Sequence, residues 1–153
     1  MKKHLPIILL IVISLVLIIG SFFLALKVIN FKREEIGKEK VTFMEFFNNK
    51  SKPTLKTVLI GMSFGLIFGF IDNAGLWIGL DILEKYIPGG MLTKAGWGNT
   101  FSDFIGSTLG TSIAIILKTL FPITDTPIWV DSLGVVVGCI LGIYIPKFIT
   151  GKE

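Results

Sequence analysis

Long apolar runs separated by short polar segments dominate the pattern of this chain. The runs cover residues 5–29, 57–83, 91–121 and 128–149. An apolar run of about 18 residues or more is long enough for a helix to cross the hydrocarbon core of a bilayer. We therefore expect an all-α fold: a polytopic membrane helix bundle of about four transmembrane helices, in a multi-pass integral membrane protein.

The first run is longer than the apolar region of a secretory signal. Such a region has about 7–15 residues and is followed by a small-residue cleavage site. Residues 5–29 form one longer run without a clear cleavage motif. We therefore expect residues 1–30 to be an uncleaved transmembrane anchor, residues 31–56 a polar connector, and residues 57–149 a three-helix membrane core that carries the polar site.

Two segments leave alternatives open. Residues 41–47, which read Val-Thr-Phe-Met-Glu-Phe-Phe, suit either a short helix at the level of the lipid headgroups or a segment that packs on the helix bundle. The third run is long for one span, and its segment Gly96-Trp97-Gly98 suits either a tilted helix or an interrupted one.

Composition and charge agree with a membrane protein. Apolar types make up 52% of the 153 residues, and the mean hydropathy is +0.77. The net charge is +4, but the basic residues lie mostly outside the apolar runs, as expected for topology signals and headgroup contacts. We expect the lipid bilayer as a partner and no nucleic acid, since nucleic-acid binding calls for a basic face on a folded soluble domain.

The chain offers little for zinc or nucleophilic chemistry. Cys139 is its single cysteine and His4 its single histidine. A disulfide framework needs paired cysteines, and a zinc site needs several Cys or His ligands. Cysteine–histidine or serine–histidine–aspartate catalysis needs a nucleophile beside a base. We therefore expect no enzymatic activity and no required cofactor.

Small residues recur at four-residue intervals in the last three runs. Positions four apart share one helix face. Lipid gives helices no hydrophobic reason to associate, so close backbone approach at small residues must hold them together. We expect the last three helices to pack tightly through these stripes and the first to be peripheral. The stripes are Gly61, Gly65 and Gly69; Ser102, Gly106 and Gly110; and Gly134, Gly138 and Gly142.

Of the aspartates within the apolar runs, two lie far from the ends of their runs, Asp72 in the second and Asp103 in the third. Asp72 precedes the turn Pro88-Gly89-Gly90 by about 16 residues, and Asp103 follows it by about 13. At about 1.5 Å per helical residue, both lie roughly 20–24 Å from that turn. We therefore expect them at matching depth on adjacent antiparallel helices, where a carboxylate costs a few kcal/mol.

The surroundings of these acids suggest three ways to accommodate them, because no Lys or Arg lies at that depth. The carboxyls can be protonated, can hydrogen-bond to each other and to nearby amides and hydroxyls, or can bind a hard cation such as Ca²⁺ or Na⁺. A neutral hydrogen-bonded knot that only holds helices together is the structural alternative. The expected ion-binding set is Asp72, Asn73, Asn99, Ser102 and Asp103, with Asp72 and Asp103 as the metal-binding carboxylates and Asp81 as a candidate entrance residue.

The two segments that carry these acids resemble a known family. Residues 69–73 read Gly-Phe-Ile-Asp-Asn and residues 98–103 read Gly-Asn-Thr-Phe-Ser-Asp. These motifs resemble those of the family of the mitochondrial inner-membrane protein called transmembrane protein sixty-five. The last span of that family is similar to residues 134–142, and the resemblance extends over about residues 57–148.

This family is implicated in sodium-dependent calcium export from mitochondria. The resemblance thus implies cation exchange, with Asp72, Asn73, Asn99 and Asp103 as ligands at the matching positions. The chain departs from the family at residues 91–97, which replace an alanine-rich segment and bring a lysine near the entrance of the site. It also has an N-terminal anchor in place of a transit peptide, so a mitochondrial location does not follow.

The sequence therefore predicts a membrane cation transporter or exchanger, for calcium and/or sodium, with its site between the second and third spans. Four helices are few for alternating access, so we expect a homodimer with the glycine stripes at or near its interface. A non-transporting scaffold or regulatory subunit of a larger membrane complex is the alternative. A small drug or proton-coupled exporter is disfavoured, because such proteins place the working acid in the first span and residues 5–29 contain none.

Overall fold

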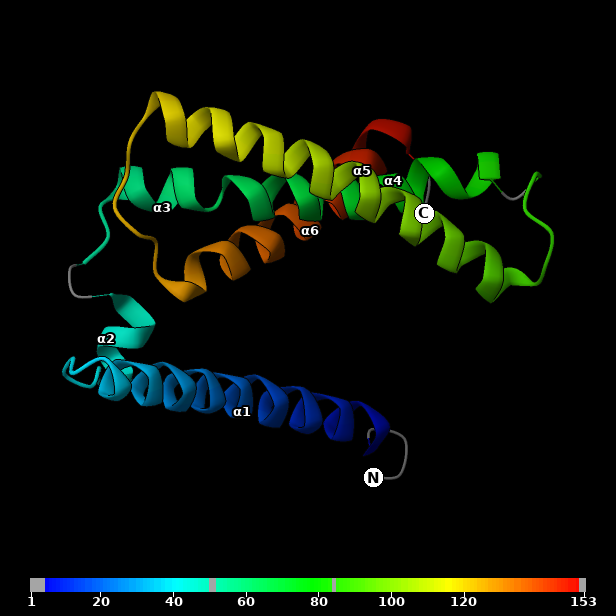
Figure 1. Cartoon of the computed structure of the whole chain (residues 1–153). Coiled ribbons are helices and arrows are strands. Elements are labelled where there is room, and N and C mark those ends of the chain that lie inside the picture. The colour runs from blue at the N-terminus through cyan, green and yellow to red at the C-terminus, as the bar shows by residue number, and fades with distance from the viewer. Residues whose placement is uncertain (1–4, 50–51, 84, 152–153) are drawn as a thin grey trace. The chain divides into compact units, whose positions relative to one another are not determined.

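The computed structural model describes residues 5–49, 52–83 and 85–151, with backbone alone for residues 77–83. This part of the chain is helical, without a β-strand, so the all-α prediction is confirmed (Figure 1). The helices are α1 (Leu5–Glu35), α2 (Phe43–Asn48), α3 (Leu55–Gly61), α4 (Ser63–Leu83), α5 (Met91–Leu120) and α6 (Ile128–Thr150).

Three of the helices, α1, α5 and α6, are each long and apolar enough to cross a membrane, as a multi-pass membrane protein requires. A fourth span arises if α3 and the first part of α4 are counted together. Leu55–Gly61 and Ser63–Leu76 meet the same length and composition requirement as a pair, with a bend of 40° between them. The count of four spans therefore stays a prediction that depends on this bent pair.

The break between α3 and α4 has a local cause. Gly61 and Ser63 flank it, and the hydroxyl of Ser63 donates a hydrogen bond to the Ile60 carbonyl at 2.7 Å. Glycine–serine pairs are common sites of helix bending, whereas the same type of hydroxyl bond also occurs at Ser107 within the unbroken α5. The second apolar run consequently forms two helices rather than one.

The chain divides into two compact units, Met1–Phe47 and Asn48–Glu153. In the first unit, α2 packs its aromatic rings on α1. The ring of Phe47 lies 5.9 Å from that of Phe22, and the ring of Phe43 lies 5.7 Å from that of Phe23. The apolar segment 41–47 thus packs on a helix of its own unit, and its depth in a bilayer stays a prediction.

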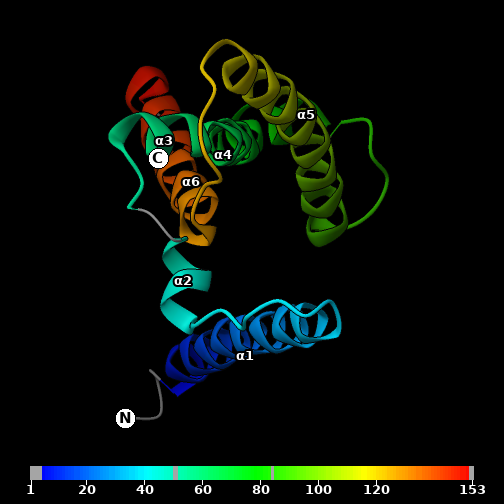
Figure 2. The same cartoon turned by 60° about the vertical axis from the view of Figure 1, so that its left-hand side comes forward.

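Helix α4 lies between α5 and α6 in the second unit (Figure 2). Against α6 the two backbones come very close at the glycines. A Cβ built on Gly134 would lie 2.5 Å from the Met62 carbonyl oxygen, and one built on Gly142 would lie 2.5 Å from that of Phe70. Atoms cannot approach so closely, so this arrangement of α4 and α6 needs glycine at both positions.

The contact between α4 and α5 also uses small residues of α5. A Cβ on Gly110 would lie 3.0 Å from the Phe64 carbonyl oxygen, and one on Gly106 would lie 3.2 Å from that of Phe68. The buried positions of α5 continue beyond the predicted stripe in both directions: Gly98, Ser102, Gly106, Gly110 and Ala114. That the contacts of α4 with α5 and α6 hold membrane spans together in lipid stays a prediction.

Helix α5 runs without a break through residues 96–98, so the interruption considered for this segment is wrong.

Candidate functional site

Asp72 and Asn73 are consecutive residues of α4, but their side chains contact different helices. An α-helix has about 3.6 residues per turn, so consecutive side chains point about 100° apart. Asp72 is directed at α5 and Asn73 at α6. Because α4 is the central helix of its unit, one dipeptide contributes polar contacts to both flanking helices.

Ser102 connects Asp72 to α5. Its hydroxyl oxygen lies 3.1 Å from Oδ1 of Asp72 and 3.0 Å from the Asn99 carbonyl oxygen. Ser102 itself is buried, with 5% of its surface exposed. One hydroxyl has a single proton and cannot donate fully to two acceptors. Both contacts are therefore full hydrogen bonds only if the Asp72 carboxyl is protonated and donates to the serine oxygen. Otherwise one of the two acceptors needs a further donor.

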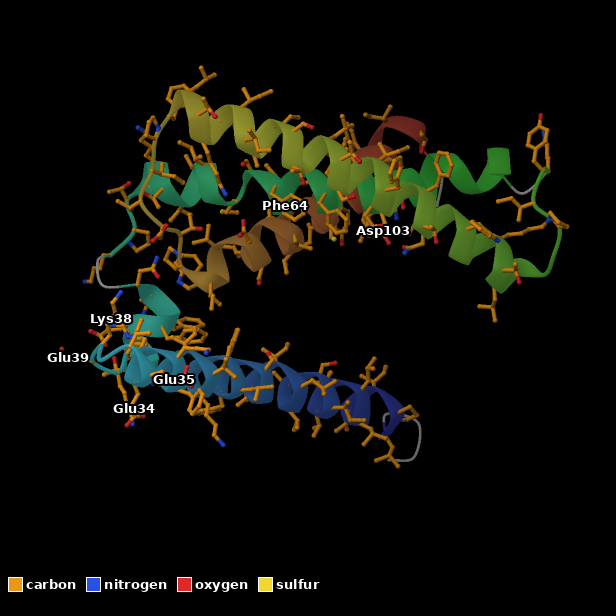
Figure 3. The ribbon with its side chains drawn as sticks, in the orientation of Figure 1. Glu34, Glu35, Lys38, Glu39, Phe64 and Asp103 are labelled. Carbon is orange, nitrogen blue, oxygen red and sulfur yellow. The ribbon has the colours of Figure 1, made fainter. Side chains whose placement is uncertain are left out.

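Asp103 completes the contact between the two helices. Its Oδ2 accepts a hydrogen bond of 2.8 Å from the side-chain amide of Asn99, one turn earlier on α5. Its carboxyl also lies within electrostatic and hydrogen-bonding range of Asp72. Figure 3 labels Asp103 on α5 and Phe64 on α4. We call Asp72, Asn99, Ser102 and Asp103 the polar cluster.

Asn73 is not part of the polar cluster, because its side chain contacts α6 instead. Its side-chain amide donates a hydrogen bond of 3.1 Å to the Cys139 carbonyl oxygen on α6. The amide thus joins α4 to α6 rather than facing the two carboxyls. Asp81, the candidate entrance residue, belongs to α4, but its side chain lies outside the described residues.

The polar cluster is closed on its α4 side and open on the outer side of α5. Ser102 is buried, Asp72 and Asp103 are partly exposed, and Asn99 is exposed. The groups that Asp72 meets, Ser102 and Asp103, carry no positive charge. The cluster therefore places two like carboxyls together without a fixed base to neutralise them.

The donor set of the polar cluster limits the chemistry that it can perform. Carboxylate and hydroxyl oxygens are ligands for hard cations such as Ca²⁺, whereas soft or borderline metals prefer thiolates and imidazoles. Among the described residues, no three Asp, Glu, His or Cys side chains gather in a way that could hold a metal ion. A cation at this cluster would therefore need neutral oxygens beside its two carboxylates.

One contact of this region was missed by sequence reasoning. The partner of Asn73 is a backbone carbonyl of α6, and every residue offers such a carbonyl. No sequence signal singles out Cys139 for this contact. The extension of the small-residue stripe to Gly98 and Ala114, in contrast, was readable from the same four-residue spacing.

Comparisons with known proteins add no relative to these observations. No protein-family model matches the chain, and neither a curated protein nor a solved structure matches it.

Proposed function

We propose that this chain is a membrane cation transporter or exchanger, for calcium and/or sodium, that binds its ion at the polar cluster. One observation carries the proposal: the carboxyls of Asp72 and Asp103 approach each other from facing apolar helices, and Asp72 has only neutral or acidic partners. An ionisable group inside a membrane is costly and typically marks a path for ions or protons. A cation is the partner that removes this cost for both acids at once.

The ligand arithmetic favours a hard cation. Two carboxylates balance one Ca²⁺ or two Na⁺. Calcium takes about 6–8 oxygens at about 2.3–2.6 Å, from carboxylates, hydroxyls, carbonyls and water. Asp72, Asp103 and Ser102 supply the charged and hydroxyl oxygens, and water would complete the shell. Asn99 acts differently here, because its amide donates to Asp103 and so orients that carboxylate.

The resemblance of residues 57–148 to the family of transmembrane protein sixty-five supports the same proposal. That family is implicated in sodium-dependent calcium export, and its motif positions coincide with Asp72, Asn73, Asn99 and Asp103. Membership in the family is itself part of the proposal. So are a count of four spans, with α3 and α4 as one bent span, and tight glycine-mediated packing of the last three in lipid.

A non-transporting scaffold or regulatory subunit is the second candidate, and one observation favours it. Among the described residues, no buried side-chain nitrogen or oxygen lacks a hydrogen-bond partner. The Ser102–Asp72 contact can tie α4 to α5 without any ion. This candidate predicts that the purified chain moves no cation and co-purifies with a larger complex.

Calcium binding to the purified protein separates the two candidates. A ligand that binds only the folded state raises the unfolding temperature in a concentration-dependent way. We expect calcium to raise it for the wild type and for Asp131→Asn, an exposed acid on α6 outside the polar cluster. We expect no rise for Asp72→Asn. An equal rise in all three proteins would contradict binding at the cluster.

A further inference from the structure

A groove lies along the C-terminal part of α1, within the first unit of the chain. Its floor is one face of the helix, because the lining residues from α1 recur at intervals of three and four. Lys40, from the segment after the helix, lines its wall. Its volume of about 570 Å³ lies in the range of about 300–1,000 Å³ that is typical of small-molecule sites. We call it the α1 groove, and its lining residues from α1 are Phe23, Leu26, Lys27, Asn30, Phe31 and Glu34.

The α1 groove is apolar at one end and charged at the other. Residues 5–26 contain no charged side chain, and Lys27 is the first to follow them. Phe23 and Leu26 therefore form the apolar end, and Glu34, about two helical turns beyond Lys27, belongs to the charged end. A lysine near the end of a membrane helix lays its stem along apolar surface and keeps its ammonium at the headgroup level. In a bilayer the groove thus passes from the level of the acyl chains to that of the headgroups.

The groove itself contains two amines and one carboxylate. Nζ of Lys40 lies 3.0 Å from Oε2 of Glu34, and both side chains are more than half exposed. An exposed pair of this kind contributes little energy, so Lys40 can turn to another anion at small cost. Lys27 is exposed and forms no ion pair with any residue that the structure describes. One positive charge of the groove is therefore left without a counter-charge.

The segment around the groove adds to this positive charge. Residues 27–40 contain five basic and three acidic side chains, and Figure 3 labels Lys38 and Glu39 among them, near the end of α1. Nε of Arg33 donates to the backbone carbonyl of Glu39 at 2.6 Å, which is a neutral acceptor. Clusters of basic residues beside a membrane helix attract anionic phospholipids. The charge of this segment thus favours an anionic occupant in the groove.

We propose that the α1 groove binds an anionic phospholipid, with the lipid phosphate at Lys27 and Lys40 and an acyl chain along Phe23 and Leu26. Lysine amines donate charge-assisted hydrogen bonds to phosphate oxygens. A free phosphate leaves the apolar end of the groove empty, and a zwitterionic headgroup brings no net negative charge to Lys27. The inference rests on the membrane placement of α1, and neither on the polar cluster nor on transport.

Displacement of a fluorescent phosphatidylglycerol from the full chain in an uncharged detergent tests the proposal without any substitution. We expect the probe to bind, and unlabelled phosphatidylglycerol to displace it at a several-fold lower concentration than phosphatidylcholine does. Free glycerol phosphate should not displace it. Absence of binding, or displacement by phosphatidylcholine at an equal concentration, would overturn the preference for an anionic lipid. Displacement by glycerol phosphate at the concentration of the lipid would overturn a lipid as the occupant.

Two pairs of matched variants separate the groove from the general charge of the segment. Lys27→Gln and Lys32→Gln lower the net charge equally, but only Lys27 lines the groove. We expect Lys27→Gln to weaken binding of the probe roughly five-fold and Lys32→Gln to leave it nearly unchanged. Glu34→Gln removes the acid of the groove and should strengthen binding, whereas Glu35→Gln, outside the groove, should not. Equal effects within each pair would mean diffuse attraction rather than a site, and would overturn the proposal.

Discussion

The hydroxyl of Ser102 on α5 lies 3.1 Å from Oδ1 of Asp72 on α4, at a point where the two helices are very close. A Cβ built on Gly75 would lie 2.7 Å from the Ser102 Cβ. The small size of both residues therefore allows the contact, and the serine brings a hydrogen-bond donor to the Asp72 carboxyl. Ser102 thus takes part both in the close helix contact and in the polar cluster.

Removal of this donor tests the structural part of the contact. We expect Ser102→Ala to lower the free energy of unfolding by about 0.5–2 kcal/mol, the range of interhelical hydrogen bonds in membranes. Thermal unfolding in detergent measures the change. Ser107→Ala is the matched control, because its hydroxyl bonds within its own helix. Equal losses for the two variants would mean that the Ser102–Asp72 contact contributes nothing specific.

The α4–α6 contact predicts a strong dependence on glycine. A Cβ on Gly138 would overlap the Leu66 carbonyl oxygen, so we expect Gly138→Ala to destabilise the protein by about 1–3 kcal/mol through overpacking. Gly96→Ala meets nothing within 4 Å on α5 and should instead stabilise it by up to about 1 kcal/mol through helix propensity. Unfolding temperatures that move in the same direction for both variants would contradict this packing.

Substitution of Asn73 and substitution of Asn99 should affect calcium affinity differently. Asn73 bonds to α6, so Asn73→Ala should lower the free energy of unfolding by about 0.5–1.5 kcal/mol and leave calcium affinity unchanged. Asn99 orients Asp103, so Asn99→Ala should weaken calcium binding. Calcium titrations of both variants measure the difference. A comparable loss of affinity in Asn73→Ala would return that residue to the ion-binding set.

Asn30 should control the turn after α1. Its side chain donates to the Val41 carbonyl at 3.0 Å and accepts from the Val41 N–H at 2.8 Å. We expect Asn30→Ala to free this segment and to speed tryptic cleavage after Lys38 and Lys40. Glu35→Gln, which removes an exposed ion pair of little energetic value, is the control. Unchanged cleavage of Asn30→Ala would show that other contacts hold the turn.

The sequence predicted the helices well because their signals are local. Run length and apolar content suffice to recognise α1, α5 and α6. The break at Met62 was not predicted, because it lies between Gly61 and Ser63 without a proline to mark it. For segment 41–47 the sequence left open a headgroup-level helix or packing on the bundle, since ring stacking on α1 depends on a tertiary contact.

The candidate site was predictable in part for the same reason. Helical rise alone suggested that Asp72 and Asp103 occupy facing helices, and the side chains do come within range of each other. The direction of Asn73 was not predictable, because it depends on which side of α4 receives α6. Periodicity gives the faces of a helix, but only tertiary structure tells which neighbour each face meets.

Calcium flux into proteoliposomes under a sodium gradient tests the central claim, that the Asp72–Asp103 pair carries a cation. Radioactive calcium uptake should be measured for the wild type, Asp72→Asn, Asp103→Asn and the control Asp131→Asn, each reconstituted to the same density. The account predicts uptake for the wild type and the control, and loss of uptake for both cluster variants. Full uptake by Asp72→Asn and Asp103→Asn, or none by the wild type, would contradict it.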